Sequence, residues 1–421
     1  MKQQTSKFLN TLTVSFFLAK AQLKRTNVWT TLLIIFIMVL TFMNVVVVNG
    51  ILVGLVEGSS IAYRKQYSGD IIIQNYENKE EIKDSFGIIQ TLKGQLETKH
   101  VTSRILAPCT LETNYKNRTN INDKTEQLTT RCAGINIEDE DAVTGIKKFV
   151  IAGQFLREDD EAGIVIGNNL LENYARGAPG DTTLSNIDVG SKVRITINGT
   201  VQELTVRGIV KSKIDEMSRR VYLNQSYLRK ILNKPNNDAN EIVVALKPGT
   251  DPVAFKETLL TYNIQRYGNI KTWEESQGQF FKDISATFNS LGTIIGSIGI
   301  VVASITVFIV IYINAVTRRK YIGILKAIGI SGLTIELSYV YQSMFYSLLG
   351  SAIGTGLLFG LLKPAIDKNP IDFPFSDGIL VAPLPDVLSK ILLLLIITMI
   401  AGYIPAKLIV RKNTIDSILG R

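Results

Sequence analysis

Four long stretches without a charged residue constrain this chain more than any other feature. They cover 26–56, 284–317, 337–362 and 391–406. A bilayer core needs about 20 apolar residues in helical form, with a usual range of roughly 17–25. The first three stretches satisfy that length, and the fourth does so once it is extended to 388–410, with Lys390 and Lys407 reaching opposite interfaces. The sequence therefore predicts an α-helical membrane protein with four transmembrane helices, over 29–56, 284–316, 337–362 and 388–410.

The charge distribution predicts the orientation of these helices. The formal net charge is +9. The N-terminal segment 1–28, the connection 317–336 and the tail 411–421 are basic. In contrast, 59–282 together with Asp283 is neutral, and the loop 363–387 is slightly acidic. Short basic loops stay in the cytoplasm. Both termini are therefore expected in the cytoplasm, with 59–282 and 363–387 outside, and the basic charge is weak evidence for nucleic-acid binding.

The segment before the first span has its own pattern. Phe8, Leu12, Phe16, Ala19 and Leu23 recur at helical spacing, with lysines elsewhere on the turn. This is typical of an interfacial amphipathic helix, and an ordinary basic flank of a membrane helix is the alternative. The apolar stretch that follows is too long for a cleaved signal peptide and is expected to be retained as an anchor.

Residues 59–282 are predicted to form a large α+β extracytoplasmic domain, inserted between the first and second transmembrane helices. Strands are expected over 69–75, 164–166, 192–206, 220–223 and 242–246, with Asn198-Gly199 as a hairpin turn. Helices are expected over 168–175, 225–232 and 251–262, and loops over 114–130, 138–141, 158–161 and 234–240. A further helical pattern begins at Trp273 and is expected to continue into the second span, with a break near Gly292 as the alternative.

The two cysteines, Cys109 and Cys132, both lie in the predicted outer domain. An oxidising compartment permits one disulfide between them, and two free thiols are the alternative.

No residue pattern for catalysis, cofactor binding or metal binding is found. The dipeptide Gly-Lys does not occur, which excludes a Gly-x4-Gly-Lys-Ser/Thr phosphate loop. His100 is the only histidine, and neither a Gly-x-Ser-x-Gly elbow nor a Cys/His cluster is present. The chain is therefore not expected to hydrolyse ATP or to hold a cofactor or metal by itself. The scarcity of charge inside the spans also disfavours an ion-driven pump or a channel.

Glycines at four-residue spacing lie in the second and third spans. They are Gly292 and Gly296, Gly350 and Gly354, and Gly356 and Gly360. Small residues let helix backbones approach closely in lipid. A subunit interface or sliding seam is one interpretation, and packing within a single set of four helices is the other.

The most informative segment is Arg318-Arg-Lys-Tyr-Ile-Gly-Ile-Leu-Lys-Ala-Ile-Gly329. Its apolar residues Tyr321, Ile324, Leu325 and Ile328 fall at i, i+3, i+4 and i+7, which predicts a short amphipathic helix with one apolar stripe. Both a partner groove and a lipid surface accept such a helix.

This segment resembles the coupling loop of the MacB/FtsX-like family of ABC-transporter permeases, whose pattern is roughly Arg-x-x-Glu-Ile-Gly-Ile-Leu-Arg/Lys-Ala-Ile/Leu-Gly. The residues that match it are Gly323, Ile324, Leu325, Lys326, Ala327 and Gly329, while Tyr321 stands where the family usually has Glu. The segment 401–419 is similar to the family's closing Gly-x-x-Pro-Ala-x-x-Ala-x-Arg/Lys ending, with Ile409 in place of the second Ala. The order of one span, a large outer domain and three further spans is also the layout of this family.

The resemblance implies a permease subunit in the bacterial inner membrane that pairs with a second permease copy. It also implies docking on a separate cytoplasmic ABC ATPase, which would hold the ATP and Mg²⁺. The docking residues would be Arg318, Arg319, Tyr321, Gly323, Ile324, Leu325, Lys326, Ile328 and Gly329. Closure of the ATPases would move the second span and pass the motion to the outer domain, where the substrate is handled. In relatives with a fused ATPase, that domain precedes the first span, whereas this chain starts directly with its anchor.

The sequence does not distinguish clearly between two branches of this family. Segments 164–171, 188–193, 206–210 and 270–275 resemble the outer domain of lipoprotein-releasing permeases of the LolC/LolE type, whose layout is closest. Similar segments occur in stand-alone MacB-like export permeases for small molecules or peptides, and both interpretations are kept. A non-transporting FtsX-like signal relay is less favoured, because its outer domain is typically much smaller. A membrane-anchored hydrolase lacks a catalytic constellation.

Overall fold

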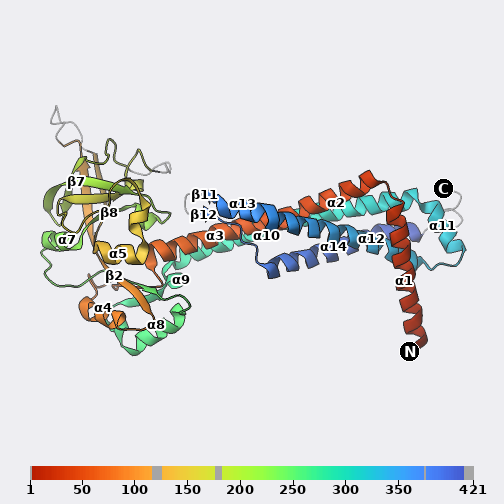
Figure 1. The fold of residues 1–421 in the computed structure, drawn as a ribbon, viewed down its shortest axis with the longest axis horizontal. Coiled ribbons are helices and arrows are strands. Elements are labelled where there is room, and N and C mark those ends of the chain that lie inside the picture. The colour runs from red at the N-terminus through yellow and green to blue at the C-terminus, as the bar shows by residue number, and fades with distance from the viewer. Residues whose placement is uncertain (1, 116–125, 176–182, 374–375, 412–421) are drawn as a thin grey trace. The chain divides into compact units, whose positions relative to one another are not determined.

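The computed structural model describes residues 2–115, 126–175, 183–373 and 376–411. The chain divides into two compact units, coloured by residue number in Figure 1. The helical unit consists of 1–56, 284–371 and 378–421, and the sheet unit consists of 57–283 and 372–377.

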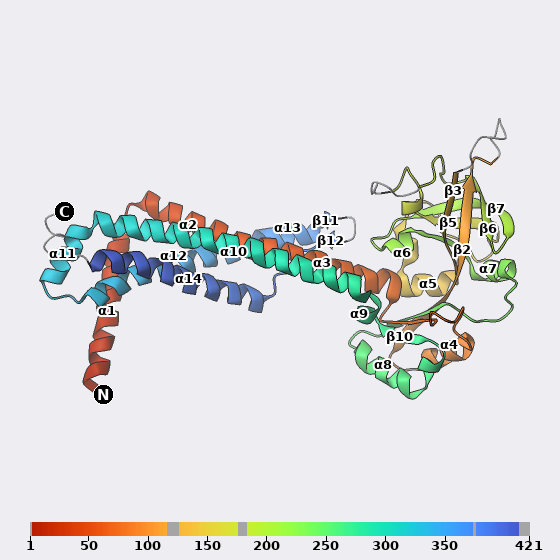
Figure 2. The same cartoon turned by 180° about the vertical axis from the view of Figure 1, so that it is seen from behind.

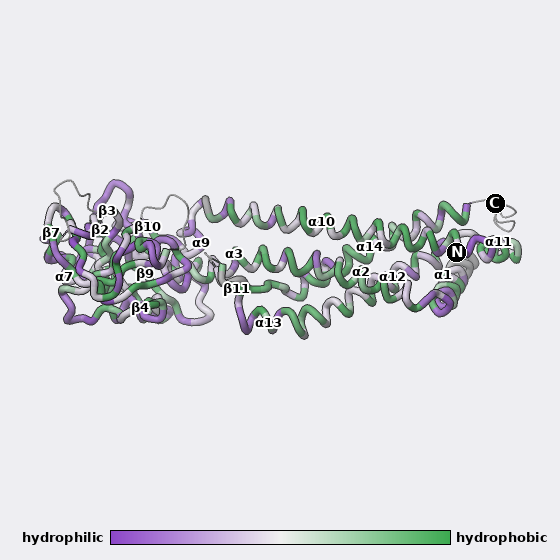
Figure 3. The backbone as a smooth tube through the Cα atoms, turned by 90° about the horizontal axis from the view of Figure 1, so that it is seen from above, coloured by the Kyte–Doolittle hydropathy of each residue, from purple (hydrophilic) through white to green (hydrophobic). Residues whose placement is uncertain are grey.

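Within the described residues, four helical runs are long and apolar enough to cross a membrane. They are Val28–Ser68, Phe281–Thr317, Gly332–Lys368 and Leu384–Val410, and the helices of the helical unit are predominantly apolar in Figure 3. The first run follows α1 (Lys2–Lys24) and is built from α2 (Val28–Met43), η1 (Asn44–Val48), α3 (Asn49–Tyr63) and η2 (Arg64–Ser68), of which η1 and η2 are π-helical. The remaining helices are α10 (Gly278–Thr317), α11 (Arg319–Ala327), α12 (Gly332–Leu357), the π-helical η6 (Leu358–Leu362), α13 (Lys363–Lys368) and α14 (Leu384–Val410).

The helical unit is organised around α12, which packs against α1, α2 and α14. Its buried core draws Ile34, Met38 and Phe42 from α2 and Tyr339 and Tyr346 from α12. The buried apolar side chains that α10 contributes to this core form one narrow stripe, made of Ala303, Val307, Ile311 and Ala315. The spacing of four residues along this stripe places all four side chains on one face of the helix. Most of the other large apolar residues of α10 are exposed in this unit, as expected of surfaces that meet lipid or another subunit.

The helical runs are longer than the uncharged stretches predict. The first run extends to Ser68, twelve residues beyond the predicted end, and the third extends to Lys368. No proline interrupts 57–68, and charged residues are compatible with helix once it has left the hydrocarbon core. Lack of charge therefore marks the apolar part of each run and not its ends.

The predicted helix from Trp273 is interrupted. The short α9 (Trp273–Ser276) ends before Gly278, whose φ of +76° is a left-handed conformation that favours glycine. Helix α10 then continues through Gly292 without the alternative break. The helix that enters the second span therefore begins at Gly278.

The sheet unit is built on a ten-stranded mixed sheet. The strand order is β10-β1-β9-β2-β3-β8-β5-β7-β4, and β6 pairs with both β2 and β7. The strands are β1 (Ile71–Gln74), β2 (Thr98–Thr113), β3 (Glu126–Ile135), β4 (Val150–Gly153), β5 (Gly163–Gly167), β6 (Lys192–Ile197), β7 (Thr200–Val210), β8 (Arg220–Asn224), β9 (Glu241–Leu246) and β10 (Asn269–Thr272). The two-residue strands β11 (Ile371–Asp372) and β12 (Asp377–Gly378) form a separate pair.

Helices pack on the sheet mainly around β10, β9, β2 and β3 (Figures 1 and 2). Helix α4 (Ser85–Lys93) packs on β2 and β9, α8 (Pro252–Thr261) packs on β10, and α7 (Gln225–Leu232) packs on β3. The remaining helices of this unit are α5 (Ile137–Thr144) and α6 (Asp215–Ser218), with the 3₁₀ turns η3 (Ile146–Phe149), η4 (Asn168–Leu170) and η5 (Ile264–Arg266). Consecutive apolar residues are buried in β1 and β9 because both faces of these strands are covered.

The predicted hairpin forms as expected. Residues of β6 pair with those of β7 from Lys192 with Thr205 to Ile197 with Thr200. Asn198 and Gly199 have φ values of +47° and +77°, as a type I′ turn requires.

Three local predictions in the sheet unit are wrong. The predicted loop over 114–130 is too long, because 126–130 belong to β3 and pair with 109–113 of β2, while 116–125 lie outside the described residues. Residues 168–175 form only a 3₁₀ turn, because the buried Asn168 side chain donates a hydrogen bond of 3.0 Å to the carbonyl oxygen of Tyr174 and so competes with helical pairing. Residues 138–141 are not a loop but lie in α5, whose N-cap Asn136 accepts hydrogen bonds from the N–H groups of Glu138 and Asp139. Acidic residues in a first turn favour a helix start, so this signal was present in the sequence.

Candidate functional site

The candidate site is α11, the short helix between α10 and α12. It ends where Gly329 adopts a φ of +96°, and Ile330 N–H donates to the carbonyl oxygen of Leu325 at 3.0 Å. This is the glycine-terminated ending that helices commonly use, and a side chain at Gly329 would strain it. The glycine at position 329, which matches the family pattern, is therefore explained by the backbone conformation that ends this helix.

The apolar residues of α11 divide between two faces. Ile322 and Gly323 are buried, and Leu325 is half-buried against the core of the helical unit. Tyr321, Ile324 and Ile328 are 65%, 50% and 69% exposed. The predicted stripe is therefore corrected: Leu325 turns toward its own core, and the exposed apolar face consists of Tyr321, Ile324 and Ile328, at i, i+3 and i+7.

Arg318, just before α11, and Lys326 within it hold this helix in place. Arg318 donates to the carbonyl oxygen of Gln22 at 3.3 Å and to the hydroxyl of Thr26 at 3.2 Å, next to the end of α1. Lys326 donates to the carbonyl oxygen of Val410, the last residue of α14, at 3.0 Å. Cations at the carbonyl end of a helix are electrostatically favourable. Arg318 and Lys326 thus join α11 to two other helices, a role that the sequence pattern did not reveal.

Helix α1 is itself docked on α12. The Ser15 hydroxyl donates to the carbonyl oxygen of Thr334 at 2.9 Å, and Phe16 packs edge-on against Tyr341. The neighbouring Phe17 is 69% exposed. The predicted face therefore serves partly for packing inside the protein, while the side chain of Phe8 lies outside the described residues.

The predicted glycines differ in what surrounds them. A Cβ at Gly350 would lie 2.5 Å from Met38 Cβ, at Gly354 2.4 Å from Phe42 Cδ1, and at Gly292 2.4 Å from Asn49 Oδ1. A Cβ at Gly296, Gly356 or Gly360 would meet nothing within 4 Å. The first three allow close approach to the first helical run, so they act in packing within one chain. Gly299 and Gly402, which were not predicted, make similar approaches to Asn44 and Ser343.

Inside the sheet unit, the end of the first run contacts α9, the short helix that precedes the second run. The Tyr63 hydroxyl donates to the carbonyl oxygen of Ser276 at 3.0 Å, and the Arg64 guanidinium lies 5.5 Å from the Trp273 ring centroid. Thr272 and Glu275 form a capping box at the start of α9. The two chain segments that lead to the apolar helices are thus bonded to each other.

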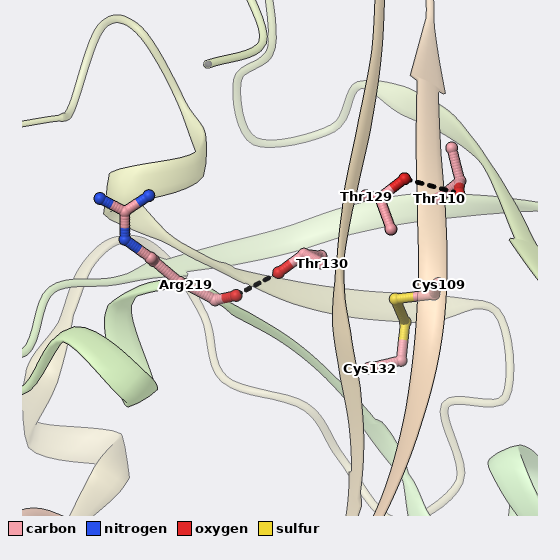
Figure 4. Close-up of a disulfide and its surroundings, with 6 residues drawn as sticks. All are labelled: Cys109, Thr110, Thr129, Thr130, Cys132 and Arg219. Carbon is pink, nitrogen blue, oxygen red and sulfur yellow. Dashed lines mark hydrogen bonds between the residues drawn. A yellow bond between two sulfur atoms is a disulfide. The ribbon is translucent and has the colours of Figure 1, made fainter. Parts of the chain in front are cut away.

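Cys109 and Cys132 form a disulfide between β2 and β3 (Figure 4). Their Cα atoms are 5.7 Å apart, which suits such a bond. Both residues are buried in the largest core cluster of the sheet unit. Among the described residues, no group of three or more His, Cys, Asp or Glu is placed to hold a metal ion.

Comparison with protein families gives two matches that together cover most of the chain. Residues 31–262 match the model of the MacB-like periplasmic core domain, and residues 293–414 match that of the FtsX-like permease C-terminal domain. The first match alone covers more than half of the chain. The chain belongs to the MacB/FtsX-like family of ABC-transporter permeases. As a member of that family, it is a membrane protein with a large extracytoplasmic domain, and it is a permease component of ABC transporters.

Curated relatives of this MacB/FtsX-like permease are considerably longer than the matched part. The macrolide export ATP-binding/permease protein MacB of Haemophilus ducreyi is 26% identical over 208 residues, which are 48% of this chain and 27% of that protein. MacB 2 of Aeromonas hydrophila is 24% identical over 229 residues, covering 53% of this chain and 33% of that protein. The chain thus spans about a quarter to a third of these relatives.

Two solved structures resemble part of the permease. The periplasmic region of MacB from Actinobacillus actinomycetemcomitans has a TM-score of 0.34 and 16% identity, covering 49% of this chain and 89% of that one. The extracellular domain of the ABC-type transporter YknZ from Gram-positive bacteria has a TM-score of 0.29 and 17% identity, covering 45% and 86%. At TM-scores below 0.5, neither likeness supports a conclusion about the fold.

Proposed function

We propose that this chain is the permease subunit of an ATP-driven transporter of the bacterial inner membrane, with both termini in the cytoplasm. It works with a separate cytoplasmic ABC ATPase, which holds ATP and Mg²⁺, and with a second permease copy, identical or different. The observation that carries this proposal is the exposed apolar face of α11, Tyr321, Ile324 and Ile328, on a helix whose opposite side is fixed to α1 and α14. A supported apolar face suits docking into a groove of a partner.

The proposed mechanism transmits motion instead of threading a substrate through the bilayer. Closure of the ATPase subunits displaces α11, and the displacement passes through Arg318 to α10. Helix α10 is continuous over 40 residues from Gly278 to Thr317, a length of about 60 Å at 1.5 Å per residue. Its first residue follows α9 and β10 closely in the chain, so the motion is delivered to the sheet unit.

The substrate is extracytoplasmic or membrane-anchored. Relatives named for macrolide export favour export of small molecules or peptides. The sequence segments around 164–171 and 188–193 favour lipoprotein release as the second candidate. Depletion of the protein distinguishes the two, because export predicts lower tolerance to the exported compound, whereas release predicts lipoproteins retained in the inner membrane. A division defect with normal lipoprotein sorting and normal tolerance would instead indicate an FtsX-like relay.

The partner assignment is tested by purification of the tagged full chain in mild detergent, followed by identification of every retained protein. We expect an ABC ATPase and a second permease copy. A purified complex that is active on its substrate but contains no nucleotide hydrolase would overturn the proposal.

A further inference from the structure

Four charged side chains form a buried cluster in the sheet unit. Arg104 on β2 donates to the Glu140 carboxylate from Nε at 3.0 and 3.1 Å and from Nη2 at 2.7 Å, and its Nη1 donates to Glu241 at 3.1 Å. Arg220 on β8 donates to both carboxylate oxygens of Glu241, at 3.1 and 3.2 Å. All four side chains are 5% exposed or less. The cluster therefore contains two positive and two negative charges, removed from solvent and paired.

A contribution to the stability of the fold does not by itself explain such a buried charge cluster. Desolvation of buried ions can exceed the gain from their attraction, so that well-packed apolar residues often stabilise a fold as well or better. What charged hydrogen bonds add is directionality, because each holds its partners within a few tenths of an ångström.

Tyr67 is the one described residue of the first helical run that is hydrogen-bonded to this cluster. Its hydroxyl donates to Glu241 at 2.7 Å and accepts from Arg220 Nη2 at 3.1 Å, and its backbone carbonyl oxygen accepts from Arg104 Nη2 at 2.9 Å. The guanidinium carbons of Arg104 and Arg220 lie 5.1 and 5.0 Å from its ring centroid, within range of a cation–π interaction. Hydroxyl, ring and backbone of one residue are thus all held by the same charges.

Tyr67 lies in η2, at the end of the run Val28–Ser68 that contains the first apolar span. The charged partners come from β2, β8 and β9, and Glu140 comes from α5. Movement of the helix end along its axis would break several hydrogen bonds to charged groups at once. The helix and the three strands are therefore expected to move together, or to change between two discrete arrangements.

We propose that Tyr67 is a positioning residue that fastens the first helical run to the sheet, so that motion of this helix, and not only of α10, reaches β2, β8 and β9. This inference rests on the proposed function for the origin of the motion. The fastening itself can be measured on the full chain without an ATPase.

The test compares Tyr67→Phe with Tyr222→Phe by hydrogen–deuterium exchange of the full chain in lipid nanodiscs. Tyr67→Phe keeps the ring and the backbone bond but removes the hydroxyl that joins Glu241 and Arg220. Tyr222 is a matched control, because its buried hydroxyl makes a single bond of 2.9 Å, to the carbonyl oxygen of Met217. We expect amide exchange of 57–68 to rise by a factor of about 10 or more in Tyr67→Phe, as for loss of a hydrogen bond to a charged group, and to stay unchanged in Tyr222→Phe. Unchanged exchange of 57–68 in Tyr67→Phe overturns the inference.

A second measurement separates positioning from simple support of the fold. In the complex with its ATPase, wild-type protein should change exchange in β2, β8 and β9 when a non-hydrolysable ATP analogue is added. Tyr67→Phe should lose this change while the ATPase stays bound, and Tyr222→Phe should retain it. Retention of the change in Tyr67→Phe contradicts the inference. Glu241→Gln, which removes the charge and keeps an acceptor, is the second variant and should behave as Tyr67→Phe does.

The two proposals fail in different ways. If no ATPase binds, the proposed function is contradicted, and the exchange of 57–68 in the chain alone still decides whether Tyr67 fastens the helix. If the ATPase binds and both tyrosine variants behave alike, only the fastening is contradicted.

Discussion

Lys326 Nζ lies 3.0 Å from the carbonyl oxygen of Val410, so that the short helix α11 is hydrogen-bonded to the last residue of α14. A charged hydrogen bond of this kind is worth about 1.5–3 kcal/mol. We expect Lys326→Met to raise the amide exchange of 319–327 by about tenfold or more. Lys320→Met is the control, because Lys320 is exposed on the adjacent turn and surface changes are usually within about 0.5 kcal/mol. Equal exchange in the two variants would show that this bond does not hold the helix.

Two glycines of α12 provide a matched pair for testing the packing of the helical unit. A methyl group at Gly350 would meet Met38 Cβ at 2.5 Å and the Met38 carbonyl carbon at 3.2 Å, which cannot move aside as a flexible side chain could. Gly350→Ala should therefore lower the stability of the purified protein by about 1–3 kcal/mol, the usual effect of overpacking. Gly356→Ala meets nothing within 4 Å and should be neutral or stabilising. Thermal unfolding in detergent compares them, and a Gly350→Ala variant as stable as Gly356→Ala would contradict the close approach of α12 and α2.

The disulfide should stabilise the sheet unit. It closes a segment with a sequence separation of 23, for which restriction of the unfolded chain corresponds to about 3 kcal/mol. Unfolding of the wild-type full chain should occur at a lower denaturant concentration in the presence of a strong reductant. The double variant Cys109→Ala with Cys132→Ala should be insensitive to reductant. A wild-type midpoint that does not respond to reductant, with mass spectrometry showing both thiols free, would exclude a stabilising disulfide.

The buried cluster predicts a loss of stability in acid. Burial raises the pKa of Glu241, but the charges of Arg220 and Arg104 outweigh this effect and hold the pKa at about 2, below its ordinary value of 4.5. Because the folded pKa is the lower one, the unfolded chain binds more protons between these values. The contribution of Glu241 is then complete above about pH 4.5 and is lost as the pH falls toward 2. Denaturant unfolding of the full chain from pH 6 to pH 2 checks this. Glu241→Gln should be less stable at pH 6 and should lose less stability in acid, and a parallel loss in both proteins would contradict the assignment.

The sequence predicts well those features that depend on local composition. Long uncharged stretches identify the four apolar helices, the Asn198-Gly199 dipeptide identifies the hairpin turn, and the spacing within 321–328 identifies α11 as an amphipathic helix. Each of these signals lies within one segment, and its physical cause is local.

Features that depend on distant partners could not be predicted in this way. Arg104 and Glu241 are 137 residues apart and meet only because β2 pairs with β9. Whether Gly350 or Gly356 is the packing residue depends on which face of α12 meets α2, and both glycines occur in the same four-residue pattern. Leu325 and Ile324 are equally apolar, and only the position of α14 and the rest of the core decides which of them is buried. Helix ends were misplaced for a similar reason, since charge marks the edge of the bilayer and not the end of the helix.

Docking at α11 is tested most directly by the ATP hydrolysis of the co-purified ATPase. Ile324→Asp places a charge on the exposed apolar face without disturbing the buried one. Val201→Asp, at a similarly exposed apolar residue of β7, is the control. We expect the wild-type protein and Val201→Asp to bind and stimulate the ATPase equally, and Ile324→Asp to lose at least about tenfold in affinity, because a carboxylate would be desolvated in the groove. Equal binding and stimulation by Ile324→Asp would contradict the coupling of this permease to its ATPase through α11.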